Sequence, residues 1–308
     1  MAGRGRVMNR SRLRHVLMES GLCFDRIRLL EWLLKHDRMR VLAFRFLRLR
    51  FSPAILSNAV KTSSDLTEAG RLFSLGMSFI NVGDTYKTTT SERTVLADEV
   101  LSRLAKTLDG PQLLEIGVSD GSSSLNLLRR KDIFSSIILT DRFSHFHVRK
   151  IPLGKMFFDG DRCLLGIKLL CFYLNLALEK SSNVSDCSRI ETVNPVVEKE
   201  GGISVIDQFN LFEDVLEEPV HFIKCSNILN ESYFTSEQIV SAVGNLAKSL
   251  VLGGRLVVSH NNDKYKHGEA VLVLRNDPSA FCVEENLNQH ELAPLFESYS
   301  SDFQAAGE

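Results

Sequence analysis

The feature that most constrains the fold is an alternation of short apolar runs with segments of helical periodicity. The apolar runs are QLLEIGV (112–118), SSIILTD (135–141), GGISVID (201–207), VHFIKCSN (220–227) and GGRLVVSHN (253–261). Helical patterns separate several of them, the clearest being SEQIVSAVGNLAKSL (236–250). Apolar strands that alternate with helices are typical of a parallel sheet covered on both faces. The sequence therefore predicts an α/β fold with a doubly wound, mostly parallel sheet.

Two further patterns frame this sheet. TTTSERTVLADEVLSRLAKTL (88–108) predicts a helix, with Thr89 and Glu92 at capping-box spacing. EAVLVLRNDPSAFCVEEN (269–286) places two strand-like runs around a turn at residues 276–279. We therefore expect the sheet to end in a C-terminal antiparallel hairpin.

The amino-terminal part of the chain differs sharply in charge from the rest. Residues 1–50 carry twelve Arg and one Lys against four acidic residues, a local charge of +9, so the net charge of −1 leaves −10 for the other residues. Apolar residues recur there at helical spacing. The sequence predicts a basic helical extension (1–60), a linker (61–84) and an α/β domain (85–300). Such an extension could contact an anionic membrane, nucleic acid or its own acidic body.

The connection between the second and third predicted strands, residues 142–200, is longer than a strand-to-strand link requires. Within it, CLLGIKLLCFYLNLAL (163–178) contains Lys168 and is shorter than the roughly twenty residues of a membrane span. We expect this segment to be a buried or interfacial helix in a helical insertion. It could form an apolar lid over an acceptor pocket.

Six scattered cysteines without a CxxC pair favour reduced thiols in a cytoplasmic protein. A peripheral membrane contact through residues 1–50 or 163–178 stays open beside this expectation.

The turn after the first strand, in LLEIGVSDGSSSLNLL (113–128), lets the backbone bend sharply and a ligand approach it closely. In such sheets, ligands bind beyond the carboxyl ends of the strands. A dinucleotide fingerprint would require G-x-G-x-x-G, and two of its glycines are missing here. This pattern disfavours an NAD-dependent oxidoreductase.

The spacing Glu115-x-Gly117-x-Ser119-x-Gly121 resembles the first motif of class I S-adenosylmethionine-dependent methyltransferases, in which a glycine usually stands at the position of Ser119. The resemblance implies a seven-stranded Rossmann-like sheet and S-adenosyl-L-methionine as cofactor. It implies an acid at Glu115 suited to the cofactor's amino group. Asp141, at the end of the second strand, would accept hydrogen bonds from ribose hydroxyls.

Two later segments extend the resemblance. Asn210 and Leu211 stand where methyltransferases often carry a polar and an apolar residue against adenine, with Asp207 as a competing candidate. The segment CSNILNESYF (225–234) is similar to chemotaxis-receptor O-methyltransferases, although Ser226 replaces that family's Arg. In this loop, Asn227 could bind the methionine portion or the acceptor, or it could cap the following helix.

Methyl transfer from a sulfonium needs alignment of the acceptor, and a general base only where the acceptor must lose a proton. Candidate bases at the ligand edge are His260 and Tyr233, whereas His221 should lie at the opposite edge. His145 and His147 are two potential metal ligands without a carboxylate cluster, so no metal site is expected.

The sequence thus favours a methyltransferase with an unidentified acceptor, which could be a small molecule or presented at a membrane. The alternatives are a catalytically silent module that acts as a scaffold through its basic helices and, less favoured, an NAD-dependent oxidoreductase. Nucleic-acid methylation is disfavoured by the −10 charge of the body and by the lack of an Asn/Asp-Pro-Pro-Tyr/Phe loop.

Overall fold

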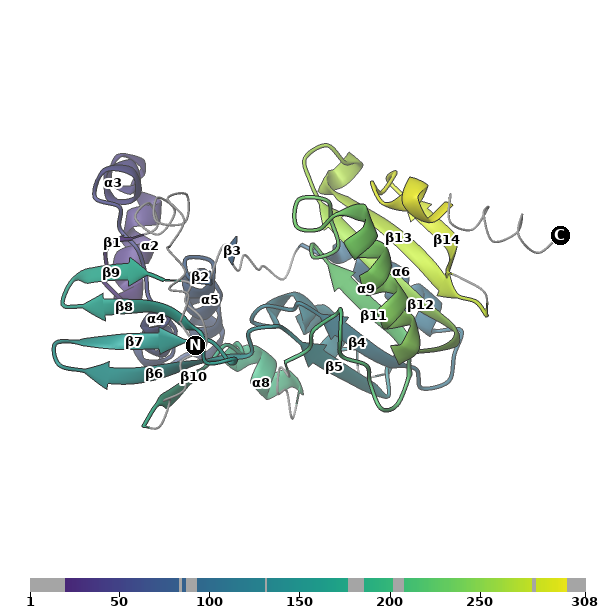
Figure 1. Ribbon diagram of the computed structural model, residues 1–308, viewed down its shortest axis with the longest axis horizontal. Helices are drawn as coiled ribbons and strands as arrows, with labels where there is room; N and C mark the ends of the chain where they lie inside the picture. The colour runs from purple at the N-terminus through teal and green to yellow at the C-terminus, as the bar shows by residue number, and fades with distance from the viewer. Residues whose placement is uncertain are drawn as a thin grey trace, which may run out of the picture. The chain divides into compact units, whose positions relative to one another are not determined.

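The computed structural model describes residues 20–82, 85–86, 93–130, 132–176, 186–201, 208–278 and 281–297 of the chain. The chain divides into two compact units, each assembled from two separate stretches (Figure 1). Unit 1 comprises Met1–Thr88 and His145–Val196, and unit 2 comprises Thr89–Ser144 and Val197–Glu308.

Unit 2 contains a mixed sheet in the order β14-β13-β12-β11-β4-β5. Its strands are β4 (Gln112–Ile116), β5 (Ser136–Thr140), β11 (Val220–Ser226), β12 (Leu250–Asn261), β13 (Glu269–Asn276) and β14 (Phe281–Leu287). The first four are mutually parallel, β13 pairs antiparallel with β12, and β14 pairs antiparallel with β13. The predicted α/β class and C-terminal hairpin are confirmed. The described sheet has six strands, and the strand predicted at 201–207 lies outside the described residues.

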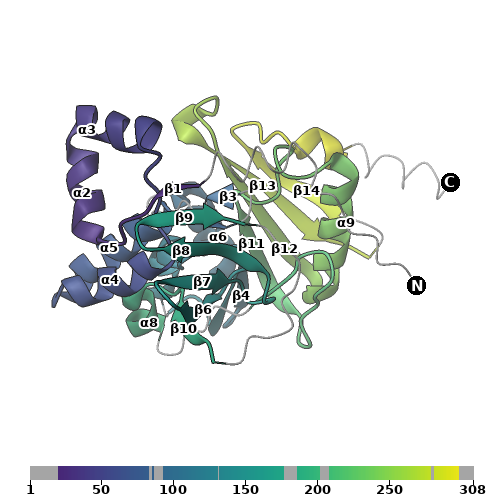
Figure 2. The same ribbon diagram turned by 60° about the vertical axis from the view of Figure 1, so that its left-hand side comes forward.

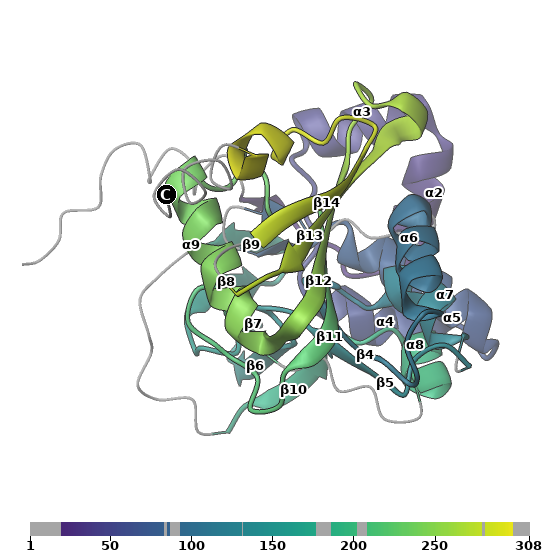
Figure 3. The same ribbon diagram turned by 90° about the vertical axis from the view of Figure 1, so that its right-hand side faces the viewer.

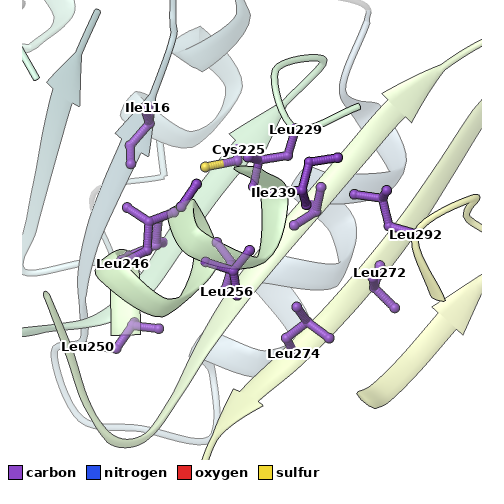
Figure 4. Close-up of a cluster of buried hydrophobic side chains, with 14 of the residues drawn as sticks. Ile116, Cys225, Leu229, Ile239, Leu246, Leu250, Leu256, Leu272, Leu274 and Leu292 are labelled. Carbon is purple, nitrogen blue, oxygen red and sulfur yellow. The ribbon is translucent and has the colours of Figure 1, made fainter. Parts of the chain in front are cut away.

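Helices cover both faces of this sheet, with α9 (Ser236–Leu246) on one face and α6 (Val95–Ala105) and α7 (Leu125–Leu128) on the other (Figure 3). The strands supply alternate residues to the two layers, as their period of two requires. Leu113 packs with α6, and its neighbour Leu114 packs with α9. Figure 4 shows the α9 layer, in which Leu246 and Ile239 contact the sheet.

Polar groups set the starts of these helices. Thr235 and Gln238 form a reciprocal capping box at α9. At α6, the carboxylate of Glu269 on β13 accepts hydrogen bonds from the backbone N–H groups of Leu96 and Ala97 at 2.9 and 3.3 Å. The predicted cap at Thr89 and Glu92 lies outside the described residues. The short helices η2 (Ser122–Ser124), η3 (Ala247–Ser249) and η4 (Lys266–Gly268) complete the unit, and α8 (Pro195–Gly201) spans the boundary between the units.

Unit 1 is built on an antiparallel sheet in the order β1-β9-β8-β7-β6-β10. Its strands are β1 (Gly21–Leu22), β6 (His145–Ile151), β7 (Gly154–Phe158), β8 (Leu164–Leu169), β9 (Phe172–Asn175) and β10 (Ser188–Glu191). Its other elements are α2 (Ile27–Lys35), α3 (Asp37–Val41), η1 (Leu42–Phe46), α4 (Ala54–Thr62), α5 (Leu66–Met77), β2 (Asn81–Val82) and β3 (Thr85–Tyr86).

The predicted helix at 163–178 is wrong, because residues 164–175 form the β8–β9 hairpin. The apolar run is interrupted at Leu170, whose φ of 50° is left-handed. Burial along β9 then alternates, with Tyr173 buried and Phe172 62% exposed. The described residues of the insertion therefore form antiparallel strands followed by the start of α8, and the helical lid is withdrawn.

The predicted domain division is also corrected. The segment expected as a linker, 61–84, contains helix α5, which Asp65 caps by accepting from the backbone N–H of Glu68. Within the region expected as a separate extension, 1–60, the described residues from 20 onward share a core with the inserted sheet, in which Cys23 and Ala54 pack with Val148 and Phe157. No helix among the described residues has the length and apolar character needed to cross a membrane.

Candidate functional site

The order of the parallel strands in unit 2 creates a switch point at β4. The chain passes from β4 to β5 on one side, and the next described strand of the sheet, β11, pairs with β4 on the other. Ligands in open α/β sheets bind at such a point, outside the carboxyl ends of the strands. The loop after β4 begins there.

This loop contains three residues with left-handed backbone: Gly117 (φ 72°), Ser119 (φ 61°) and Gly121 (φ 81°). The backbone N–H of Gly117 donates to the carbonyl oxygen of Thr140 at 2.7 Å, which fixes the loop to the end of β5. The structure thus brings together the three loop positions that the motif predicts. The side-chain oxygens of Ser119 and Ser124 are buried and have no hydrogen-bond partner among the described residues.

Asp141 follows β5 and is 6% exposed. One carboxylate oxygen accepts from the backbone N–H of Ser119 at 2.7 Å, and the other accepts from the backbone N–H of Phe143 at 2.8 Å. Asp141 therefore lies beside the loop, as predicted. In this state its carboxylate organises the backbone of the loop.

Gly117 itself is covered. A Cβ added to this residue would lie 1.8 Å from Cδ1 of Ile228, in the loop after β11. A ligand that approaches Gly117 from the direction of this Cβ would meet the Ile228 side chain first. The sequence pattern gave no signal for this cover.

Glu115 does not reach toward a ligand, which corrects its predicted role. Its carboxylate forms an ion pair with Lys224 of β11 at 2.8 Å, and both side chains are almost fully buried. Lys224 also donates to Asp98 of α6 at 2.7 Å and to the hydroxyl of Thr94 at 3.2 Å. An ammonium has three donors, so these partners satisfy Lys224 completely. The lysine inside the apolar run VHFIKCSN was the signal in the sequence for this cluster.

The charges of the cluster shift its proton equilibria. Burial raises the pKa of Asp98 to about 6, with repulsion from Glu115 adding to the effect and Lys224 opposing it. Burial disfavours the charge of Lys224, but the two carboxylates outweigh it and raise its pKa.

Asn227 joins two strands. Its side-chain N–H donates to Oδ1 of Asn261 at 2.8 Å, and its Oδ1 accepts from the backbone N–H of Asn261 at 2.8 Å. Both ends of the amide are therefore used between β11 and β12. Asn227 neither caps α9, whose cap is Thr235, nor presents a free amide to a ligand in this state.

His260, in β12, has a carboxylate partner. Its Nδ1 lies 3.0 Å from an oxygen of Glu291 and 3.4 Å from the hydroxyl of Tyr265. A carboxylate on Nδ1 favours the tautomer in which Nε2 can accept a proton. Tyr233, the other predicted base, is 57% exposed in the turn before α9 and packs edge-on against Phe234.

Asn210 and Leu211 lie in a turn near α9. The side chain of Asn210 is exposed and donates to Glu213 at 3.1 Å, whereas Leu211 packs against the core on the α9 face. No contact between Asn210 and the β4 loop is seen among the described residues. The competing candidate, Asp207, lies outside those residues.

The three other histidines considered as candidates lie outside this site. His221 accepts from the backbone N–H of Gln112 at the opposite, amino-terminal edge of β4, as predicted. His145 and His147 face each other on β6 in unit 1, with Nε2 atoms 3.1 Å apart, and burial lowers the pKa of both. In the part of the chain that the structure describes, no group of three or more potential metal ligands is present.

Comparison with known proteins finds similarity among solved structures. No protein-family model matches the sequence, and no curated protein matches it. Among solved structures, an O-methyltransferase family protein from Burkholderia thailandensis matches with 13% identity and a TM-score of 0.33, over 64% of this chain and 44% of that one. An S-adenosylmethionine-dependent methyltransferase from Clostridium acetobutylicum matches with 10% identity and a TM-score of 0.37, over 69% and 80% of the two chains.

An amino pentose methyltransferase from Micromonospora echinaspora, solved with S-adenosylmethionine bound, matches with 13% identity and a TM-score of 0.32, over 70% and 81% of the two chains. The chain thus spans less than half of the Burkholderia protein.

Proposed function

We propose that unit 2 binds S-adenosyl-L-methionine at the carboxyl ends of β4 and β5 and transfers its methyl group to an acceptor. The observation that carries this proposal is the left-handed loop at the switch point, held beside Asp141. Glycines in such a loop carry no Cβ and permit close approach of a ligand to the backbone, and the switch point is where α/β sheets bind nucleotides.

We infer that an adenosyl group binds on the β5 side of the loop, next to Asp141. The unpartnered hydroxyls of Ser119 and Ser124 offer donors and acceptors there. Asp141 is the acid that could accept from ribose hydroxyls if its bonds to the loop rearrange. Glu115 contributes by pairing with Lys224 of the neighbouring strand β11 rather than by touching the cofactor.

The bound cofactor would supply an activated methyl group on its sulfonium. The protein then has to orient an acceptor and, where the acceptor loses a proton, provide a base. We assign that base to His260, because Glu291 orients its ring and leaves Nε2 able to accept. Tyr233 stays a second candidate.

Calorimetry with S-adenosylmethionine and its demethylated product tests cofactor binding. Asp141→Asn should weaken binding roughly tenfold, because an amide is a poorer partner for two hydroxyl donors. Ile228→Ala should strengthen binding, because it removes the side chain that covers Gly117. Asp277→Asn, in the β13–β14 turn, is the matched control and should bind as the wild type does. Gly117→Val is unsuitable, because its Cβ would collide with Ile228.

A catalytically silent scaffold is the second candidate, and one observation favours it. Ile228 covers the glycine corner, and both Asp141 oxygens already accept from backbone N–H groups. If neither the wild type nor Ile228→Ala binds the cofactor while both stay folded, the scaffold is correct and the methyltransferase proposal fails. NADH should give no heat with either protein, since the loop lacks the dinucleotide fingerprint.

A further inference from the structure

One segment of unit 1 exposes apolar and basic side chains together. We name residues 37–48, which include α3 and η1, the arginine loop. No residue of α3 is buried, and Ala43 is the only buried residue of η1. The exposed apolar side chains of the loop are Met39, Val41, Leu42, Phe46 and Leu47. Arg38, Arg40, Arg45 and Arg48 stand between them and are also exposed.

A second exposed apolar group lies at the ends of two hairpins of the same unit. We name Leu153, Leu169, Leu170 and Phe172 the hairpin tips; they are 75%, 48%, 69% and 62% exposed. The backbone N–H of Leu170 donates to the carbonyl oxygen of Leu153 at 2.9 Å, so the two turns are adjacent. Lys150, near the same end of β6, is exposed as well.

Backbone pairing connects the two groups. Leu22 of β1 pairs with Phe172 of β9, and the backbone N–H of Arg50 donates to the carbonyl oxygen of Leu22 at 2.7 Å. The chain therefore runs from the arginine loop directly to the β1 edge of the sheet. Figures 1 and 2 both show α3 beyond this edge, after β8, β9 and β1.

The exposed side chains of this surface indicate which class of partner it binds. Clustered exposed apolar side chains mark an interaction site, because leaving them in water forgoes about 25 cal/mol for each Å² that could be buried. Residues 37–50 carry five Arg against one Asp, a charge of +4. An anionic membrane surface attracts each such charge by about 1 kcal/mol and accepts apolar side chains below its headgroups.

Nucleic acid, a second copy of the chain or residues 1–19 would account for only part of these observations. Nucleic acid would neutralise the arginines but would leave the aliphatic side chains of the hairpin tips without a role. A second copy would bring the same positive charge against itself. Residues 1–19 carry five Arg and one Glu, so this segment of the chain has the wrong charge to cover the arginine loop.

We propose that the arginine loop and the hairpin tips of unit 1 dock on an anionic phospholipid surface. The arginines contact lipid phosphates and carboxylates, and Phe46, Leu170 and Phe172 enter the interface. This docking is peripheral and does not depend on whether unit 2 binds a cofactor.

Vesicle co-sedimentation of the full chain tests the proposal. The probes are phosphatidylcholine vesicles and vesicles with about one third phosphatidylserine. Binding of the wild type should be at least tenfold stronger with phosphatidylserine and should fall with added salt. Arg38→Gln/Arg45→Gln and Phe46→Ser/Leu170→Ser should each weaken binding roughly tenfold.

Matched controls come from exposed positions of unit 2. Leu252 is 70% exposed, a fraction that matches the 69% of Leu170. Leu252→Ser therefore controls for loss of an exposed leucine. Lys106→Gln/Lys266→Gln removes two exposed charges elsewhere. Both controls should bind vesicles as the wild type does, and circular dichroism should show every variant folded.

Three results would overturn the proposal. The first is equal or absent binding to the two vesicle types at low salt, and the second is equal loss in the controls. The third is that the wild type ignores vesicles but binds duplex DNA through the two arginines, or forms a dimer that Phe46→Ser/Leu170→Ser dissolves. Those last outcomes would reassign the surface to nucleic acid or to a second copy.

Discussion

At the scale of single residues, the cluster of Lys224, Asp98 and Glu115 shows how unit 2 keeps charge in its interior. Removing a charged side chain from water costs several kcal/mol, which is tolerable only when partners and hydrogen bonds replace the water. Lys224 is completely buried and satisfied by its partners, while Asp98 and Glu115 each keep one oxygen unpartnered. The two carboxylates share a single cation, which is why the cluster is sensitive to the loss of Lys224.

Lys224→Met should therefore destabilise the protein by about 3–5 kcal/mol, because it leaves two carboxylates buried and repelling each other. Adding Asp98→Asn and Glu115→Gln to this variant should restore part of the loss, since the remaining groups are neutral. Denaturant unfolding of the single and triple variants measures both effects. Equal stability of Lys224→Met and the wild type would contradict the assigned role of the cluster.

The burial of His290 predicts that the stability of the protein depends on pH. The ring is 1% exposed, and burial, aided by the nearby His260, lowers its pKa from 6.5 to about 4. Because the unfolded chain binds the proton more readily, this group's contribution is complete above pH 6.5 and is lost as the pH falls through 4. The shift corresponds to at most about 3 kcal/mol.

His290→Asn keeps an acceptor for the backbone N–H of Leu292 and removes the titration. Asp98 acts in the opposite direction, since its raised pKa gives stability below about pH 4 that is lost as the pH rises through 6. The difference in unfolding free energy between wild type and His290→Asn isolates the histidine. As the pH falls from 6.5 to 4, the unfolding free energy of the wild type should decrease relative to that of His290→Asn. A difference that is independent of pH would refute the assignment.

At the scale of elements, the joined ends of β11 and β12 depend on Asn227. Its φ of 60° is left-handed, and its amide makes both side-chain bonds to Asn261. Asn227→Gly removes those bonds and should cost about 1–3 kcal/mol. Asn227→Ala removes the same bonds and also places a Cβ in a left-handed conformation, which should add about 1 kcal/mol. Thermal unfolding of the two variants measures this step, and an alanine variant as stable as the glycine variant would exclude strain at this position.

Sequence patterns predict the elements of unit 2 well because their physical causes are local. β4 and β11 are each recognisable as a short apolar run, and α9 is recognisable from an apolar stripe with a period of 3.6. The turn after β4 was likewise identifiable from Gly117 and Gly121, whose left-handed conformations the structure shows.

The same patterns fail where a neighbour decides the structure. The run at 163–178 is mostly apolar, and such a run fits a buried helix as well as a hairpin. In the fold, the first half of the run pairs with β7 as β8, and the second half pairs with β1 as β9. The ion pair of Glu115 and the cover of Gly117 by Ile228 depend on strands more than a hundred residues apart in sequence, so local spacing could not reveal them.

At the scale of the whole molecule, the chain builds two cores from interleaved stretches. Phe157 belongs to the core of unit 1, and Leu113 belongs to that of unit 2. Because each core is contained in its own unit, we expect two calorimetric transitions. Phe157→Ala should lower the unfolding free energy of unit 1, and Leu113→Ala should lower that of unit 2, each by about 2–5 kcal/mol. Each substitution should move one of the two transitions to lower temperature. A single transition lowered by both variants would show that the units unfold together.

The interleaving also governs how the chain matures at the ribosome. Ala54 and Cys23 pack against Val148 and Phe157, which are synthesised about a hundred residues later. At roughly 5–20 residues per second, the nascent helices wait several seconds or more for the strands that shield them. During that interval the apolar side chains of the emerging segment lack the strands that cover them, so we expect the nascent chain to be prone to aggregation.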